Sequence, residues 1–367
     1  MKKTILFFMS VFALLLISNY SFADEYAGSS ACFKCHPDQY NDFRVSGHPY
    51  KIQKAETAKH WQLPVPKGYS WDDISYVIGG AHKKTRYMDK KGYIITMTGQ
   101  NKDIPGKNQY NIKTGTWSDY SAGTKNFKYN CGPCHMTNYK KEGHQDGLEG
   151  IVGTWTFAGI QCEECHGAGK KHAETGDKTK IKVDSSSAAC GKCHIRGSKD
   201  KTPSSGGFIM HHEQYNEMLS GPHKDISCVN CHNPHKKAKF SVKTECASCH
   251  SKQAADFKGS KMESVGVKCA DCHMPKVTKS ATNKGKLEGD IKTHIFKINT
   301  DPKASMFYKE PKLDKEGKPV VGKDGKPAMN EFAKGFATLD FSCLNCHKNK
   351  DMKWAARKAK GIHKYGK

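Results

Sequence analysis

All sixteen cysteines of this 367-residue chain lie in pairs of a single spacing. Two residues separate the members of each pair and a histidine follows at once, so that the unit C-x-x-C-H occurs eight times with no cysteine left over. We number these units motif 1 to motif 8 in chain order. The cysteines are Cys32, Cys35, Cys131, Cys134, Cys162, Cys165, Cys190, Cys193, Cys228, Cys231, Cys246, Cys249, Cys269, Cys272, Cys343 and Cys346. The motif histidines are His36, His135, His166, His194, His232, His250, His273 and His347.

The adjacent histidine separates this unit from other uses of paired cysteines. A redox dithiol, which "CGPC" at 131–134 would suggest by itself, requires no histidine beside it. Structural zinc sites place their histidines further along the chain, and disulfides impose no histidine at all. Attachment of c-type haem uses all three residues, because two thiols bond to the haem vinyl groups and the histidine binds the iron. We therefore predict eight covalently bound haem c groups.

The N-terminus predicts export. Lys2 and Lys3 precede an apolar run over 5–17, and "SFA" ends at Ala23, which together are typical of a secretory signal peptide. This run is short for a membrane span, and no other apolar run approaches membrane length. We expect a signal peptide over 1–23 and a mature protein in the periplasm, at the outer surface or outside the cell.

The composition fits a core built largely from cofactor. Hydrophobic residues make up 36% of the chain and the mean hydropathy is −0.73, both low for a protein of this length. The expected fold is a multihaem cytochrome with a haem-dominated core, short α-helices and extensive loops. The formal charge of the full chain is +24. Loss of Lys2 and Lys3 with the signal peptide and the sixteen propionates of eight haems would reduce the net charge of the mature protein to roughly +6. No basic cluster is interleaved with aromatic residues, so we expect no nucleic-acid partner.

Eleven histidines outside the motifs can supply sixth ligands, which suffices for eight haems. They are His48, His60, His82, His144, His172, His211, His212, His223, His235, His294 and His363. His235 follows His232 by three residues, which span at most about 10 Å, too short to pass round a porphyrin. His235 is therefore expected to serve a different haem from His232. The same reasoning applies less strongly to His172, six residues after His166.

Two predicted helices carry further ligand candidates. The segment 207–219 shows helical spacing, and on a helix His211 and His212 would point about 100° apart. A second helix over 350–364 would present His363, far enough from His347 to fold back over a haem. We expect distal ligands among His48, His172, His211, His212, His223, His235, His294 and His363. His60, His82 and His144 are expected to be spare.

Motif spacing divides the mature chain into three parts. We predict an N-terminal region over 24–130 with motif 1, a six-motif core over 131–275, and a C-terminal region over 276–367 with motif 8. Within the first part, 73–80, 84–89 and 92–99 are typical of short strands and predict a small β-meander. The segment 315–328 repeats K-x-G-K-P and predicts an exposed hairpin or loop.

The motifs and their surroundings resemble a known group. The eight C-x-x-C-H units, "SGHPYK", "CHGAGKKH", "GGFIMHHEQY", "GPH", "CHNPH", "CADCHMPK" and "THIFKINTDP" resemble multihaem c-type cytochromes of anaerobic, often metal-reducing bacteria. More broadly, the chain is similar to the superfamily of hydroxylamine oxidoreductase and its tetrahaem electron-accepting cytochrome. The resemblance implies closely stacked haems with mostly two histidine ligands. The favoured distal ligands are then His48, His172, His212, His223, His235, His294 and His363.

The leading expectation is an electron carrier in anaerobic or extracellular respiration, with other redox proteins or a terminal acceptor as partners. Two alternatives stay open. One is an oxidoreductase with an open haem that acts on a small nitrogen or sulfur species. Against it, no C-x-x-C-K unit occurs, although related nitrite- and tetrathionate-reducing enzymes often carry one, and no tyrosine can be nominated for a haem crosslink. The other is a filament subunit, because the chain to about residue 235 is similar to subunits of extracellular cytochrome filaments.

Overall fold

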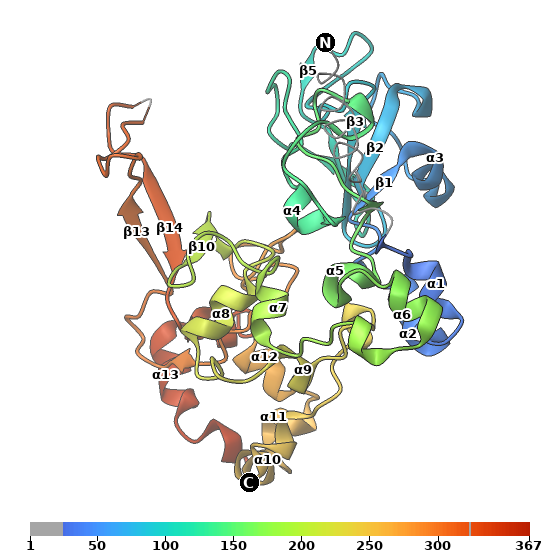
Figure 1. The fold of residues 1–367 in the computed structure, drawn as a ribbon. Coiled ribbons are helices and arrows are strands. Elements are labelled where there is room, and N and C mark those ends of the chain that lie inside the picture. The colour runs from blue at the N-terminus through green and yellow to red at the C-terminus, as the bar shows by residue number, and fades with distance from the viewer. Residues whose placement is uncertain (1–24, 323) are drawn as a thin grey trace, which may run out of the picture.

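The computed structural model describes residues 25–322 and 324–367. The signal peptide predicted over 1–23 lies outside the described residues. Figure 1 shows a β-rich upper part, a lower part of short helices joined by loops, and a hairpin that projects to one side. No helix in the described ranges is long and apolar enough to cross a membrane.

The helices are short, as the composition predicts, and none that the structure describes exceeds eight residues. They are α1 (Ser29–Phe33), α2 (Pro37–Arg44), α3 (Ala55–Ala58), α4 (Gly132–His135), α5 (Cys162–His166), α6 (Lys170–Thr175), α7 (Ser187–Gly191), α8 (Gln214–Ser220), α9 (Cys228–Cys231), α10 (Ser251–Phe257), α11 (Lys261–Ser264), α12 (Cys269–His273) and α13 (Met352–Ala359). The remaining motifs form single turns, η7 (Cys246–Ser248) and η8 (Asp340–Leu344). Most of the helices are therefore the motifs themselves or the turns that follow them.

A helical turn is the local structure that a C-x-x-C-H unit needs. The backbone N–H of the histidine donates to the carbonyl of the first cysteine in motif 1 (His36 to Cys32, 2.9 Å) and in motif 8 (His347 to Cys343, 3.0 Å). Residues three and four positions apart share one face of a helix. The turn thus brings both thiols and the imidazole of a motif to the same side.

The upper part is a five-stranded antiparallel sheet. Its strand order is β1 (Ile52–Lys54), β2 (Ile74–Gly79), β3 (Lys84–Asp89), β6 (Gln109–Asn111) and β7 (Thr116–Ser118). Neighbours in this order are also neighbours along the chain, apart from β4 (Met97–Thr98) and β5 (Ile104–Pro105), which lie outside the sheet between β3 and β6. The first two strands of the predicted meander are confirmed as β2 and β3. A core of fully buried side chains, among them Ile52, Tyr76, Met88 and Tyr129, packs on it.

The prediction of a strand over 92–99 is mostly wrong. Only β4 (Met97–Thr98) forms, and it pairs with β5 (Ile104–Pro105) outside the sheet. Gly92 and Gly99 both have positive φ, near 83° and 89°, which bends the chain at each end of the segment. The alternation of apolar residues predicted a strand here, whereas the bends at the two glycines keep the segment out of the five-stranded sheet.

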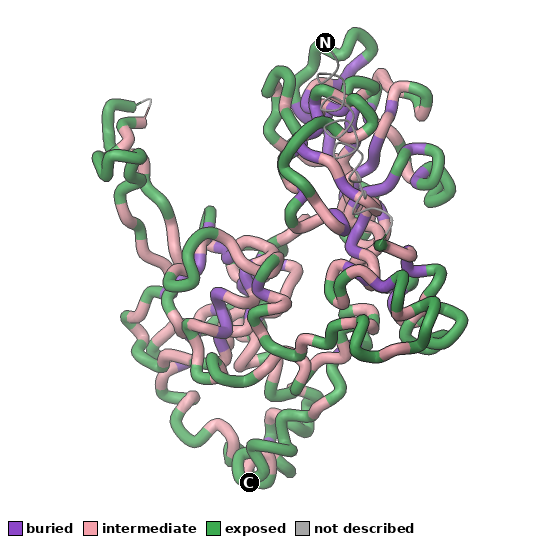
Figure 2. Tube along the Cα trace, viewed as in Figure 1, coloured by how far each residue is buried: buried purple, intermediate pink, exposed green. Residues whose placement is uncertain are grey.

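The lower part carries a four-stranded sheet. Its order is β11 (Phe208–Ile209), β10 (Thr202–Ser205), β14 (Met329–Ala333) and β13 (Phe307–Pro311). The chain between β13 and β14 forms the projecting hairpin of Figure 1, and Figure 2 shows its tip as exposed. This tip includes 315–328, in agreement with the sequence. Two-stranded ladders also join β8 (Met136–Thr137) to β9 (Phe157–Ala158) and β12 (Ile298–Asn299) to β15 (Ala337–Thr338).

The helix predicted over 207–219 begins only at Gln214. Phe208 and Ile209 instead form β11, and the N–H of Ile209 donates to the carbonyl of Val277 at 3.0 Å. Gly206 and Gly207 supply the positive φ angles of the turn before β11. The pairing of Phe208 and Ile209 with distant segments therefore decides their conformation, although the local spacing of apolar residues is helical. The helix predicted over 350–364 forms as α13 and a final turn at Ile362–Lys364, divided at Gly361.

Buried apolar side chains are concentrated in the two sheets. Between Cys162 and His273, only Phe208, Ile209 and Met218 are buried apolar residues. Figure 2 shows this lower region as mainly exposed or intermediate. A polypeptide segment this long rarely stays folded with so little apolar burial of its own.

Candidate haem sites

The sixteen cysteines are positioned as unpaired thiols. None of them forms a disulfide in the part of the chain that the structure describes. In the same residues, no group of three or more His, Cys, Asp or Glu side chains is arranged to hold a metal ion by itself.

Six motif histidines each face a second histidine from another part of the chain. The ring-centroid distances are 6.3 Å for His36 and His172, 6.4 Å for His194 and His48, 6.2 Å for His166 and His235, 6.1 Å for His232 and His294, 5.8 Å for His250 and His223, and 6.1 Å for His273 and His363. All six partners are among the eight distal candidates named from the sequence.

This separation suits two imidazoles on opposite faces of one iron. Imidazole nitrogens bind metals at about 2.0–2.1 Å, and the ring centroid lies roughly 1.1 Å further out, so two such rings have centroids about 6.3 Å apart. Direct stacking of the rings would bring the centroids closer. The six pairs therefore leave the space that a haem plane requires, and their residues fit the cofactor that the motifs predict.

Hydrogen bonds orient several of these rings. The Nδ1 atoms of His166, His172 and His273 lie 2.7, 3.0 and 3.0 Å from the carbonyl oxygens of Lys182, Asp177 and Phe296. A carbonyl can only accept, so Nδ1 carries the proton and Nε2 is left as the ligand atom. The Nδ1 of His194 lies 2.9 Å from Oε1 of Gln214, which serves the same purpose.

Burial keeps two of the facing histidines neutral. It lowers the pKa of His48 and that of His294 to about 4 in each case. Only an uncharged imidazole has a lone pair for a metal. Both rings are thus in the ligand-competent form at neutral pH.

The close spacing within "CHNPH" joins two pairs. His232 faces His294, whereas His235 faces His166 of motif 3. Similarly, His166 and His172 of "CHGAGKKH" face different partners, since His172 faces His36. The chain-reach argument predicts this separation, and short linkers hold neighbouring pairs close together.

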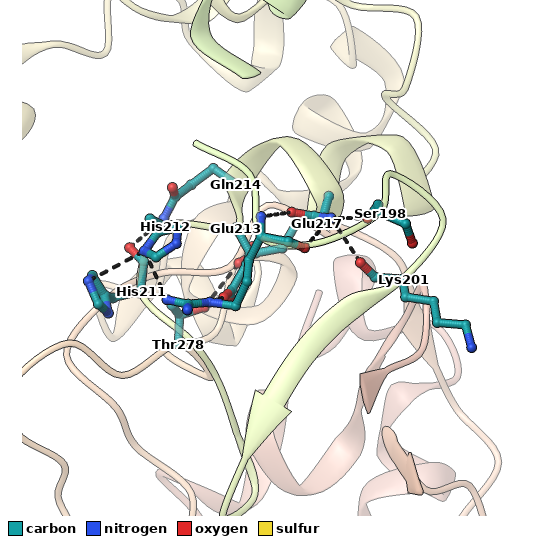
Figure 3. A network of polar contacts seen from close by, with 10 residues as sticks. Ser198, Lys201, His211, His212, Glu213, Gln214, Glu217 and Thr278 are labelled. Atoms are coloured by element: carbon teal, nitrogen blue, oxygen red, sulfur yellow. Dashed lines mark hydrogen bonds and ion pairs between the residues drawn. The ribbon is translucent and has the colours of Figure 1, made fainter. Parts of the chain in front are cut away.

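Glu217 holds the segment that presents His294. It lies on α8, is fully buried, and accepts hydrogen bonds from Oγ1 of Thr293 at 2.8 Å, from Oγ1 of Thr278 at 3.2 Å and from the backbone N–H of His294. Burial raises the pKa of Glu217 to about 7 despite these donors. Figure 3 shows Glu217 and Thr278 in the same network as Glu213. The sequence analysis missed Glu217; two acidic residues one turn apart beside apolar Met218 were the available signal.

The surroundings of motif 2 are different. Nδ1 of His135 lies 2.9 Å from the hydroxyl of buried Tyr129, and burial lowers the pKa of His135 to about 3. Burial lowers the pKa of both His135 and His211, and the charges of Lys84 and Arg86 lower both further. Burial lowers the pKa of Lys84 to about 7 and also lowers that of Arg86. Motif 2 is thus flanked by half-buried cations that the sequence analysis did not single out.

His212 is held by an arginine. Its Nδ1 lies 3.1 Å from Nη2 of Arg196, which also pairs with Glu213, and 3.5 Å from Nε2 of His211, which Figure 3 shows beside it. Because a guanidinium can only donate, this Nδ1 acts as acceptor and the proton sits on Nε2. The other facing histidines show the opposite tautomer where their Nδ1 partner is a carbonyl. The structure therefore does not place His212 as it places the six paired histidines.

In the part of the chain that the structure describes, none of the three histidines expected to be spare faces a motif histidine as the six pairs do. His60 is exposed in the turn Lys59–Trp61, and His82 lies beside Gly47. Nδ1 of His144 lies 2.5 Å from the carbonyl of Ile151 within the upper part. Motif 8 is also distinct, since the ring of its His347 packs on Trp354, with centroids 4.9 Å apart.

Nearness of thiols from different motifs orders the motifs in space. Thiols lie near one another between motif 1 and motif 3 (Cys32 and Cys162), motif 2 and motif 4 (Cys134 and Cys193), motif 4 and motif 5 (Cys190 and Cys228) and motif 6 and motif 7 (Cys246 and Cys269). The same holds for motifs 3 and 4 (Cys165 and Cys193), 5 and 6 (Cys231 and Cys249), and 7 and 8 (Cys272 and Cys343). The motifs thus follow the row 1–3–4–5–6–7–8, with motif 2 joined at motif 4.

Sequence comparisons find relatives among the cytochromes. Residues 239–365 match the family model of outer membrane cytochrome MtrC/MtrF-like domains II/IV, and residues 101–167 match that of cytochrome c554 and c-prime. The chain is 32% identical over 176 residues to multiheme cytochrome MtrA of Shewanella baltica, which covers 41% of this chain and 48% of that protein. The chain is related to multihaem c-type cytochromes.

Other multihaem cytochromes share parts of the sequence and the fold. Dissimilatory sulfite reductase MccA of Wolinella succinogenes is 25% identical over 273 residues, which cover 56% of this chain and 35% of that protein. The chain thus spans half or less of both curated relatives. Its fold matches octaheme MccA with a TM-score of 0.61 at 19% identity, covering 87% of this chain and 65% of MccA. It also matches the outer cell wall cytochrome OcwA with a TM-score of 0.56 at 20% identity, covering 91% and 86%.

These likenesses support part of what the sequence predicts. They bear out a multihaem c-type cytochrome with covalently bound haem and, coarsely, a role in electron transfer. The boundaries at residues 130 and 275 stay predictions. Assembly into filaments also stays a prediction from resemblance.

Proposed function

We propose that the chain is an exported octahaem c-type cytochrome that transfers electrons along a row of mostly bis-histidine haems. The observation that carries this proposal is the set of six facing histidine pairs. Each pair combines a motif histidine with a histidine outside the motifs at a separation of 5.8–6.4 Å. Eight attachment motifs with no spare cysteine support the haem count.

In this proposal, haem iron supplies one-electron exchange between its ferrous and ferric states. The facing histidines would hold the irons of six of the eight haems. Carbonyls such as those of Lys182 and Phe296 keep Nδ1 protonated and hold the rings in orientation. Because the same two neutral nitrogen ligands would bind the iron in both oxidation states, the ligand geometry would change little on electron transfer. The reorganisation energy would therefore be small.

The order of the thiols suggests the electron route. Electrons would travel along the row 1–3–4–5–6–7–8, in which each motif is a spatial neighbour of the next. Short segments such as His166–His172 would hold two successive haems, those of motifs 3 and 1, and so keep them close. The row runs from the helices α1 and α2 to the C-terminal helix α13, which lie in different regions of Figure 1.

Haem also accounts for the sparse apolar core. Residues 162–273 hold five motifs and only three buried apolar side chains. Five porphyrins would supply the apolar surface that this region lacks. Their propionates would offset part of the positive charge.

Location and partners follow from the same proposal. The signal-like N-terminus and the relationship to an outer membrane cytochrome family support a place in the periplasm or at the cell surface. The partners would be other redox proteins or a terminal acceptor. Their identity would be set by the haems nearest the surface at the ends of the row.

The test is the haem content and spin state of the purified, exported protein. We expect eight covalent haems per chain by mass, loss of residues 1–23, and mainly low-spin ferric signals in electron paramagnetic resonance (EPR). Fewer than eight haems, or a high-spin majority, would contradict the proposal. Reduction by a small donor followed by oxidation with a soluble iron chelate tests electron transfer directly.

A second candidate function rests on motif 2. The charges of Lys84 and Arg86 act on both His135 and His211, that of Arg196 acts on His211, and cations in a half-buried site attract oxyanions. The related sulfite reductase favours a substrate of this class. An oxidoreductase of a nitrogen or sulfur oxyanion would show turnover of sulfite, nitrite, hydroxylamine or tetrathionate. K84M should then lower that turnover more than K141M, which changes an exposed lysine.

A further inference from the structure

We infer that the haem of motif 8 has an open sixth position that binds a small anionic ligand. This inference rests on the proposed attachment of haem to Cys343 and Cys346. It departs from full bis-histidine ligation, and it concerns the end of the row where motif 7 is the neighbour.

The histidines of the chain can be accounted for one by one. Six of the eleven outside the motifs face the histidines of motifs 1, 3, 4, 5, 6 and 7. His211 and His212 contact each other, with ring centroids 4.8 Å apart, and Arg196, two residues after the motif 4 histidine, holds His212. His60, His82 and His144 lie in the upper part, which is built from other segments than motif 8. No histidine in the described residues is left for His347.

His363 does not supply a second histidine for the haem of motif 8. The sequence places it sixteen residues after His347, but its ring faces His273 of motif 7 at 6.1 Å and within 11° of parallel. Gly361, at φ 68°, ends the run from α13 and turns the chain toward α10. The C-terminal histidine is therefore committed to the preceding motif.

Trp354 lies on the same side of the site as His347. Their centroids are 4.9 Å apart with an angle of 53° between the rings. An aromatic ring on the opposite face of a haem would lie at least about 6.5 Å from the histidine centroid, because the haem-to-ring contact adds roughly 3.5 Å. Trp354 therefore supports the proximal histidine and leaves the opposite face to other groups. The side chain of Asp351 accepts from the N–H of Trp354 at 2.7 Å and fixes the start of α13.

The local charge selects the class of ligand. Residues 343–364 carry seven lysine or arginine side chains and one carboxylate, Asp351. Lys364 pairs with Asp256 at 3.4 Å, while Lys350 and Lys353 are exposed. An excess of cations at an open iron raises the local concentration of small anions and favours their binding. Azide is a suitable probe because it binds ferric haem through one nitrogen.

The experiment compares two haem-deletion variants of the full exported protein. The haem count is measured first, so a failure of haem attachment is seen separately from a closed sixth position. Ferric wild-type protein with eight haems should show a high-spin EPR signal that azide converts to low spin. C343A/C346A, which removes the motif 8 haem, should lose one equivalent of this conversion. The matched control C32A/C35A removes the motif 1 haem, between His36 and His172, and should keep the full amplitude.

A second variant leaves all eight haems in place. Trp354→Ala should change the azide dissociation constant by about two- to tenfold and shift the high-spin g values, because the ring no longer supports His347. Trp354→Phe should restore most of both. An eight-haem protein that binds no azide would overturn the inference. So would an unchanged amplitude in C343A/C346A, or an optical band of methionine-to-iron charge transfer that disappears with that variant.

Discussion

The rings of His166 and His235 lie 6.2 Å apart and within 7° of parallel, although they belong to segments around different motifs. His235 is only three residues from His232, which faces His294 instead. One short segment thus contributes to two facing pairs. This relationship links motif 3 to motif 5 more directly than their distance in the sequence indicates.

Replacing His235 should affect the haem of motif 3 and spare that of motif 5. In His235→Ala we expect one low-spin haem to become high-spin, because the ring facing His166 is removed. EPR measures the change. Adding C162A/C165A should abolish the new signal, while His60→Ala, at an exposed position, should leave the spectrum unaltered. If the new signal survived removal of the motif 3 haem, the assigned pairing would be incorrect.

Glu217→Gln should destabilise the protein. One acceptor oxygen becomes an amide NH2 that faces the donors of Thr293 and His294, and a buried group left without its partner costs about 1–3 kcal/mol. Denaturant unfolding followed in the haem absorption band measures this loss. Glu316→Gln, at an exposed position of the hairpin, is the matched control and should unfold like the wild type. Equal stability of both variants would rule out the positioning role of Glu217.

Glu217 should also contribute to the pH dependence of stability. Its pKa is raised to about 7 in the fold from an ordinary value of 4.5, so the folded state binds more protons than the unfolded state between these two pH values. Its contribution to the free energy of unfolding should therefore decrease as pH rises from about 4.5 to about 7. Unfolding curves across this range should show a smaller decrease for Glu217→Gln than for the wild type. Parallel pH profiles would count against the raised pKa.

Without haem, the two parts of the chain should behave differently. The upper sheet has its own core around Ile52, Tyr76 and Met88, whereas residues 162–273 have almost none. We expect apo-protein made in the absence of haem attachment to be largely unfolded, with no cooperative native-like melt by circular dichroism. Any amide protection in hydrogen exchange should be confined to β2 and β3. A cooperative melt of the whole apo-protein would refute this expectation.

The hairpin tip should be dispensable for the haem sites. Residues 312–322 and 324–328 lie beyond β13 and β14 and are mostly exposed, and among these described residues none is a member of a facing histidine pair. Replacing 313–327 by a two-glycine turn should leave the haem count and the optical spectrum unchanged. A loss of haem on deletion would show that the tip contributes to the sites.

The sequence by itself determined the covalent chemistry. The C-x-x-C-H unit indicates haem c because attachment requires only two thiols and a histidine, which one helical turn brings to the same side. The length of the chain between His232 and His235 was enough to predict that they serve different haems. Local patterns also sufficed for β2, β3 and α13, where the segment buries its own apolar stripe. They failed at 207–213 and 92–99, where pairing with remote segments or glycine conformation decides the backbone.

Only the tertiary structure decided which histidines meet. A sixth ligand lies on the far side of a cofactor and comes from a distant segment, so its identity depends on how the loops cross rather than on any local spacing. That is why His363 could be named as a ligand candidate while its partner, His273, could not. The same long-range geometry shows the cations around His135 and leaves His347 facing Trp354 with no second histidine.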